Sequence, residues 1–338
     1  MIGVDGIMPD RNASATYFGF DFQARAAIVI MLENIQSAIS IKLEGEEDID
    51  IKLDNGQSIL AQAKSVVKVD DFSHVREKLK GALESLSEGA SRIPAEQLIL
   101  ITNSPNPFND DNSRPLFWGP NKIRFDDLPL SSQNLVNGYL SKITNPLEAS
   151  KFIVQRVPFQ TDDEVERSKA IKNAINDFLG SISIVTPGVA NRLYDIWTSQ
   201  LLFSGTVTDK KRHITKRSFI WPIIVIETDI QSINDDLADW FDEAEYSDLT
   251  RLYHSVIDSH CERYEFITRV LYDYKQFSSN SLRKKASEFA EAYCEAYSKE
   301  FDVEGIDSQT QQNLTKIILY SIVKRWSTIE RVRQGANL

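Results

Sequence analysis

The segment GEEDIDIKLDNGQSILAQAKS, residues 45–65, places acidic, amide and lysine side chains on two strands that are otherwise apolar. Polar and apolar residues alternate along 47–53 and 58–65, as in half-buried strands, and the intervening DNG is typical of a hairpin turn. Carboxylate and amide oxygens are ligands that Mg²⁺ prefers. A lysine beside them can orient water or stabilise an oxyanion. This chemistry suits metal-assisted hydrolysis of a phosphodiester.

The alternation favours a three-residue turn, Asn55-Gly56-Gln57, with Gly56 at positive φ. A slip of one residue would move every side chain to the other face, and a two-residue Asn-Gly turn would mix polar with apolar residues. In the favoured register the polar face pairs Asp50 with Gln62 and Asp48 with Lys64. The apolar face pairs Leu53 with Ile59, Ile51 with Ala61 and Ile49 with Ala63.

Two interpretations of this polar face are open. In the first, Asp48, Asp50 and Gln62, with Glu44 just upstream, supply oxygen ligands for Mg²⁺ or Mn²⁺, and Lys64 is catalytic. In the second, the hairpin is an ordinary exposed surface, and Asp48 and Lys64 form a surface ion pair that contributes little to stability.

The elements around the hairpin indicate an α+β fold with a helical C-terminal part. Apolar spacing predicts a helix over 14–36, strands near 38–45, 47–53 and 58–65, a helix over 70–90 and a strand over 96–104. Residues 105–150 read as loops with a helix near 131–142, followed by a strand at 151–159. Helices are expected at 162–181, 187–205, 234–258, 259–279, 280–300 and 308–331. We therefore predict two domains, 1–160 and 161–338.

Composition narrows the class of protein. The 338 residues carry a net charge of −11, which argues against broad, non-specific binding of nucleic acid by the chain alone. No signal peptide is expected, the apolar runs are too short to span a bilayer, and two cysteines fit a reducing cytoplasm. The basic run TDKKRHITKR (208–217) would either follow a DNA backbone or form a solvated loop. Four further cations would flank the cleft: Lys68, Arg76, Lys78 and Lys80.

The spacing LEGEEDIDI…ILAQAKS resembles the PD-(D/E)XK nuclease signature in its variant with Gln at the second acidic position. The preceding YFGFDFQARAA is similar to the aromatic–Gln motif that opens the double-stranded DNA nuclease domain of bacterial anti-phage effectors, with FQ in place of the usual YQ. Such domains occur in CBASS effector nucleases and in the nuclease subunit of Lamassu-type systems. The resemblance covers about residues 15–105, and the order α-β-β-β-α-β accords with a restriction-endonuclease-like core.

The resemblance implies a role for each matching residue. Asp48 corresponds to the metal-binding acid, Gln62 to the second acid and Lys64 to the catalytic lysine. Glu44 corresponds to an upstream acid, and Gln23 to the helix glutamine that approaches the site. Asp50 lies at a position where many relatives have an apolar or neutral residue.

The helical C-terminal part, including 251–285, is weakly similar to Lamassu-like nuclease subunits, which work with an SMC-like ATPase and a small third subunit. The resemblance thus implies a cytoplasmic, Mg²⁺-dependent endonuclease that cuts double-stranded DNA, gated by partner subunits or by homo-oligomerisation. Three alternatives stay open: a catalytically inactive scaffold with the same fold, an RNase, and a sequence-specific restriction subunit. The helical part could equally be a generic bundle.

Overall fold

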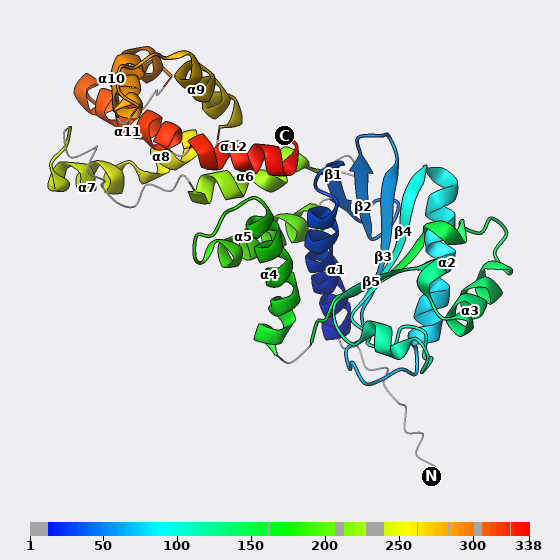
Figure 1. The fold of residues 1–338 in the computed structure, drawn as a ribbon. Helices are drawn as coiled ribbons and strands as arrows, with labels where there is room; N and C mark the ends of the chain where they lie inside the picture. Colours follow the sequence, from blue (N-terminus) through cyan, green and yellow to red (C-terminus); the bar gives the residue numbers. More distant parts are fainter. Residues whose placement is uncertain are drawn as a thin grey trace, which may run out of the picture. The chain divides into compact units, whose positions relative to one another are not determined.

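A computed structural model describes residues 13–160, 163–206, 213–227, 240–261, 263–282, 284–300, 306–324 and 326–338. The chain forms two compact units (Figure 1). The first, the sheet unit, comprises residues 1–179 and 190–216, and the second, the helical unit, comprises 180–189 and 217–338. The division therefore differs from the predicted boundary between residues 160 and 161, because two helices after residue 160 pack with the sheet.

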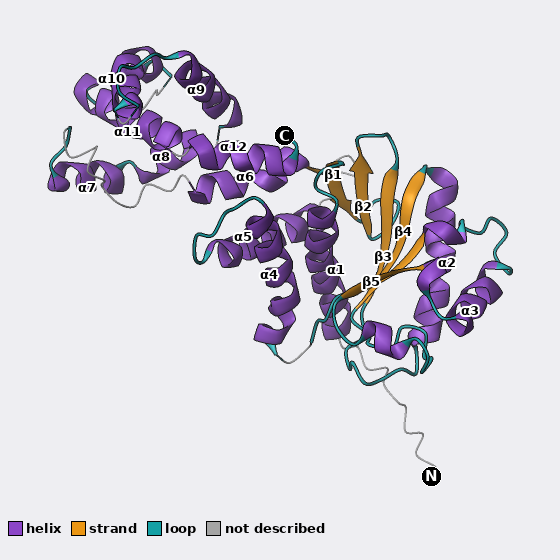
Figure 2. Ribbon diagram, viewed as in Figure 1, coloured by secondary structure: helices purple, strands orange, loops and turns teal. Residues whose placement is uncertain are grey.

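The sheet unit is built on a mixed sheet of seven strands in the order β5-β6-β4-β3-β2-β1-β7 (Figure 2). Strands β1 to β3 form an antiparallel meander, whereas β3, β4 and β6 run parallel. Strand β3 is thus the border between an antiparallel and a parallel half. The strands are β1 (Ala38–Leu43), β2 (Ile49–Leu53), β3 (Ser58–Lys64), β4 (Ala95–Thr102), β5 (Asn121–Arg124), β6 (Phe152–Arg156) and β7 (Ile214–Thr215).

Two helices cover opposite faces of the central strands (Figure 1). Helix α2 (Val75–Arg92) is amphipathic, and its predicted stripe of Val75, Leu79, Leu83 and Leu86 is buried. Helix α1 (Ala13–Glu33) is apolar on nearly every side, because it lies between the sheet and helices α4 (Glu164–Ser181) and α5 (Val189–Thr206). The predicted order α-β-β-β-α-β is therefore observed, with β3 covered on both faces.

Contacts from α1 explain why α4 and α5 belong to the sheet unit. Arg167 of α4 pairs with Asp21 of α1 at 3.5 Å. The Arg25 guanidinium of α1 lies 5.1 Å from the ring centroid of Tyr194 on α5. Gly205 of α5 leaves room for Phe20, since a Cβ there would come within 2.7 Å of the Phe20 ring.

The β2–β3 turn differs from the predicted one by one position. Leu53 N–H donates to Gln57 O at 2.9 Å, so the loop is Asp54-Asn55-Gly56. Gly56, with φ of +80°, takes the last loop position, where a type I turn followed by a bulge requires a left-handed residue. The register pairs Ile49 with Ala61 and Asp50 with Leu60. The predicted faces are preserved, but Asp48 rather than Asp50 lies across from Gln62.

The remaining elements of the sheet unit include two strands that the sequence did not predict, β5 and β7. Segment 105–150 contains β5 in addition to the helix α3 (Leu130–Leu140) and the short 3-10 helices η1 (Arg114–Phe117), η2 (Phe125–Asp127) and η3 (Ala149–Lys151). Residues 208–212 of the predicted basic connector lie outside the described residues.

The helical unit has a packed core of its own. Stacking of Phe289 on Tyr293, with ring centroids 4.6 Å apart, lies within its aromatic core. Its helices are α6 (Lys216–Glu227), α7 (Glu243–Leu252), α8 (His254–Cys261), α9 (Tyr264–Gln276), α10 (Lys285–Ser298), α11 (Ser308–Lys324) and α12 (Trp326–Ala336). Part of the helix predicted over 234–258 falls on residues 228–239, outside the described residues.

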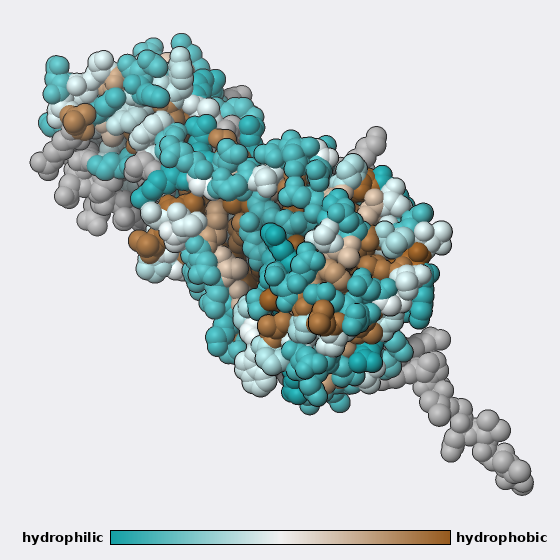
Figure 3. All heavy atoms as spheres, turned by 45° about the vertical axis from the view of Figure 1, so that its right-hand side comes forward, coloured by the Kyte–Doolittle hydropathy of each residue, from teal (hydrophilic) through white to brown (hydrophobic). Residues whose placement is uncertain are grey.

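The face drawn in Figure 3 is mainly hydrophilic, with apolar side chains in small groups. Within the described parts of the chain, no helix combines the length and the apolar character needed to cross a membrane.

Candidate active site

Hydrogen bonds from strand β3 hold the Asp48 carboxylate in place. Asp48 directly precedes β2, and continuing the β2–β3 register places it opposite Gln62. Its Oδ2 accepts a hydrogen bond from the Ala63 N–H at 2.8 Å and another from Gln62 Nε2. Gln62 is only 6% exposed. Gln62 is thus part of the folded interior and not of an exposed hairpin face, which excludes the surface interpretation for Gln62, whereas Asp48 is half-buried.

Gln23 ties helix α1 to the same site. Its Nε2 donates to Glu44 Oε1 at 2.9 Å and to the Asp48 carbonyl at 2.6 Å. Glu44 is exposed and has a φ of +54°, a left-handed conformation that costs a non-glycine residue free energy. The buried Gln23 amide therefore holds both the β1–β2 turn and the solvent-exposed carboxylate of Glu44.

Lys64 ends β3 on the same face as Gln62. Thr102 Oγ1 donates to its carbonyl at 2.6 Å, and Lys78 Nζ donates to the next carbonyl, that of Ser65, so the backbone is held from two sides. Among the described residues, its half-buried ammonium makes no hydrogen bond or ion pair. The charge of Lys64 acts on Asp48. Burial raises the pKa of the Asp48 carboxyl, and the positive charge of Lys64 opposes the rise.

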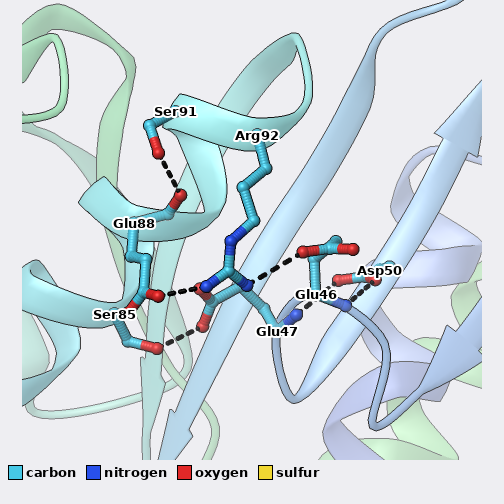
Figure 4. A network of polar contacts seen from close by, with 7 residues as sticks. All are labelled: Glu46, Glu47, Asp50, Ser85, Glu88, Ser91 and Arg92. Atoms are coloured by element: carbon cyan, nitrogen blue, oxygen red, sulfur yellow. Dashed lines mark hydrogen bonds and ion pairs between the residues drawn. The ribbon is translucent and has the colours of Figure 1, made fainter.

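Asp50 serves the β1–β2 turn instead of facing Gln62. Its Oδ2 accepts from the Glu46 N–H at 2.6 Å and its Oδ1 from the Glu47 N–H at 3.0 Å (Figure 4). A Cβ at Gly45 would come within 2.0 Å of Asp50 Oδ2. Burial raises the Asp50 pKa to about 6, against these hydrogen bonds. Both oxygens are engaged by the turn, so these contacts do not support Asp50 as a metal ligand.

Glu47 is a site residue that sequence reasoning missed. It is 6% exposed, and its Oε2 accepts a hydrogen bond from Ser85 Oγ of α2 at 2.8 Å (Figure 4). Burial raises its pKa to about 7, the Ser85 hydrogen bond opposes the rise, and the charges of Asp48 and Asp50 add to it. In the acidic run GEEDID no pattern separates this buried carboxyl from its exposed neighbour Glu46, which pairs with Arg92 at 3.1 Å.

The predicted flanking cations have different roles. Lys78 lies beside the site, and burial together with the charge of Lys64 lowers its pKa. Arg76 donates to the carbonyls of Phe108 at 3.1 Å and Asn109 at 3.0 Å, which fixes the loop after β4. Lys80 makes an exposed pair with Glu84 on α2 at 3.6 Å. Lys68 is exposed, next to the site in sequence.

The donor atoms at the site are oxygens of the kind that Mg²⁺ or Mn²⁺ binds. Asp48 and Glu44 offer carboxylates, and Gln62 has its Oε1 left for a cation because its Nε2 faces Asp48. Across the described residues, no three Asp, Glu, His or Cys side chains form a group that could hold a metal. The oxygens left for a cation in this part of the structure are thus those of two carboxylates and one amide.

Comparisons with known proteins assign no family to the chain. No family model matches it, and no curated protein or solved structure matches it significantly. The function is therefore inferred from the side chains around Asp48 and from the element order that positions them.

Proposed function

We propose that the chain is a metal-dependent endonuclease that hydrolyses phosphodiester bonds of double-stranded DNA. The observation that carries the proposal is the joined pair Asp48 and Gln62, with the Lys64 ammonium, which no described residue pairs, on the same face of β3. Each group comes from a different position of one rigid meander, as a preorganised site requires.

In this proposal Asp48, Gln62 and Glu44 would hold Mg²⁺ or Mn²⁺. The bound cation supplies charge neutralisation at the phosphate and lowers the pKa of a water molecule. Lys64 orients the attacking water and stabilises the negative charge that develops on the phosphate oxygens. Gln23 keeps the Asp48 backbone and the Glu44 carboxylate in place.

The biological setting follows from the resemblance to PD-(D/E)XK effectors. The order α1-β1-β2-β3-α2-β4 and the Asp48, Gln62 and Lys64 positions support it. We propose an effector of a bacterial anti-phage system, Lamassu-like, that acts in the cytoplasm with an SMC-like ATPase and a small accessory subunit. Cleavage would be gated by these partners or by homo-oligomerisation, since unrestrained cutting would destroy the host chromosome.

One observation favours a second candidate, an inactive scaffold subunit with the same fold. Asp50 is committed to the β1–β2 turn, so fewer carboxylates face Lys64 than the sequence predicted. A scaffold would keep the hydrogen bonds around Asp48 as structural contacts and would bind no cation.

The test is cleavage of plasmid and linear duplex DNA with Mg²⁺ or Mn²⁺, with RNA in parallel, alone and with the neighbouring gene products. We expect Lys64→Ala to lower the cleavage rate by about 10²- to 10³-fold, the usual effect of removing one oxyanion-stabilising donor. Lys80→Ala is the matched control, because Lys80 is an exposed lysine paired on α2. Equal rates for Lys64→Ala and wild type would exclude this site, and absence of both cutting and metal binding would favour the scaffold.

A further inference from the structure

Trp118 is a large aromatic side chain that the fold holds out in solvent. It is 76% exposed, although the preceding Phe117 is fully buried. A single exposed apolar residue is common and needs no special explanation. Two features distinguish Trp118: its backbone is held by several contacts, and its turn lies near Lys64.

The backbone that carries Trp118 is anchored at several points. Phe117 packs against Phe108, with ring centroids 5.9 Å apart. Arg156 Nη1 donates to the Trp118 carbonyl at 2.6 Å, and Asn121 Nδ2 donates to the Leu116 carbonyl at 2.7 Å. The indole is therefore presented on a fixed turn, and it loses little backbone freedom when a ligand contacts it.

The same anchor connects Trp118 to the candidate site. Lys64, Thr102 and Arg156 are direct register partners across β3, β4 and β6. Neighbouring strands lie about 4.8 Å apart, so the Cα of Arg156 lies roughly 10 Å from that of Lys64. Arg156 reaches the Trp118 carbonyl, which places this turn within roughly 20 Å of Lys64, about six base steps at 3.4 Å each.

Positive charge lies along this end of the sheet. Lys78, Arg76 and Arg114 join Lys64 there, and none of the four makes an ion pair within 4.0 Å in the described part of the chain. Two carboxylates lie near enough to interact electrostatically, Asp110 with Arg76 and Asp71 with Lys78. Arg114 instead lies over the Phe72 ring, 5.6 Å from its centroid. In a chain with a net charge of −11, this is a local region suited to phosphate groups.

We propose that Trp118 stacks on an unpaired base of the DNA bound along this end of the sheet. The inference rests on the proposed function and refines its substrate class to duplex DNA with an unpaired base, such as an overhang. Bases inside a duplex expose only their edges, so an indole can cover a base face only where a base is unpaired. The cations would hold the phosphates, and Trp118 would supply the preference for the unpaired end.

Binding of fluorescein-labelled DNA in Ca²⁺ tests the proposal without requiring cleavage. The ligands are a blunt duplex and the same duplex with a single-stranded overhang. We expect Trp118→Ala to weaken overhang binding roughly tenfold, the usual effect of losing one base–aromatic stack, and to change blunt-duplex binding much less. Trp118→Phe should restore most of the affinity. Tyr272→Ala, which removes another exposed aromatic (64% exposed) on α9, should change neither.

The outcome separates this inference from the proposed function. Unchanged overhang binding by Trp118→Ala, or equal losses for both duplexes, would overturn the stacking proposal while leaving Lys64-dependent cleavage intact. Conversely, Trp118-dependent overhang binding by a chain that cuts no DNA even with the neighbouring gene products would support stacking and refute the nuclease.

Discussion

The buried carboxyl of Glu47 makes the stability of the sheet unit depend on pH in a predictable direction. Below its ordinary pKa of 4.5, Glu47 is protonated in both the folded and the unfolded state. Between pH 4.5 and about 7 the unfolded state releases its proton while the folded state keeps it. The unfolded state is therefore favoured progressively as pH rises through this window, and the contribution of Glu47 to stability is lost. Replacing Glu47 by Gln, which preserves shape and a partner for Ser85, removes this titration.

The magnitude follows from the size of the pKa change. Each pH unit corresponds to 1.36 kcal/mol, so a rise from 4.5 to about 7 corresponds to about 3 kcal/mol. We expect the free energy of unfolding of Glu47→Gln, relative to wild type, to increase by about 3 kcal/mol between pH 4.5 and pH 8. In hydrogen exchange whose rate follows the opening equilibrium, this is a difference of about 150-fold in rate.

Amide hydrogen exchange of β2 and β3 in EDTA measures this effect within the sheet unit. Wild type and variant are compared at the same pH, so that the intrinsic exchange rates cancel, and EDTA removes any cation that would change the charge at Asp48. Glu84→Gln, an exposed carboxyl on α2, is the control and should show no such pH dependence. A constant difference between Glu47→Gln and wild type across this pH range would refute the reasoning.

Two further predictions concern packing beside the site. Gly89→Ala would bring a Cβ within 2.7 Å of Glu47 Oε1 and 3.1 Å of Leu60 Cδ1, so we expect a loss of about 1–3 kcal/mol in urea unfolding. At Gly81 of the same helix an added Cβ meets nothing within 4 Å, so Gly81→Ala should stabilise the folded protein by up to about 1 kcal/mol. Equal effects of Gly89→Ala and Gly81→Ala would contradict this account. Asn103→Ala would leave the buried backbone partners of the Asn103 amide, Val66 and Phe159, unpaired, and it should cost at least about 2 kcal/mol. A thermal unfolding profile of Asn103→Ala identical to that of wild type would contradict the predicted loss of stability.

The alternation in the hairpin was sufficient to predict which side chains share a face. A shift of two in the pairing keeps every residue on its face, so Asp48, Gln62 and Lys64 were grouped correctly although the register was not. The exact turn depended on where Gly56 takes its positive φ, and the sequence DNG permits more than one choice. The periodicity of α2 was equally informative, because that helix has one solvent-facing side.

Features that depend on distant contacts could not be predicted in this way. Glu47 is buried because Ser85 and Gly89 of α2 come close to it, and neither residue is near it in sequence. Strand β5 is four residues long, and its pairing with β6 gives no local signal. The membership of α4 and α5 in the sheet unit depends on the Asp21 and Arg25 contacts of α1, which helical periodicity does not report.

The position of β3 at the border of the two halves of the sheet has a consequence for the order of folding. The meander β1-β2-β3 joins neighbours in sequence, whereas β3, β4 and β6 meet only after the α2 crossover and the long segment 103–151 have closed. Contacts between sequence neighbours form faster than those that close long loops. Glu44, Asp48, Gln62 and Lys64 all lie in or beside the meander, so the groups of the candidate site meet early. The parallel half and the turn that carries Trp118 are added to them later.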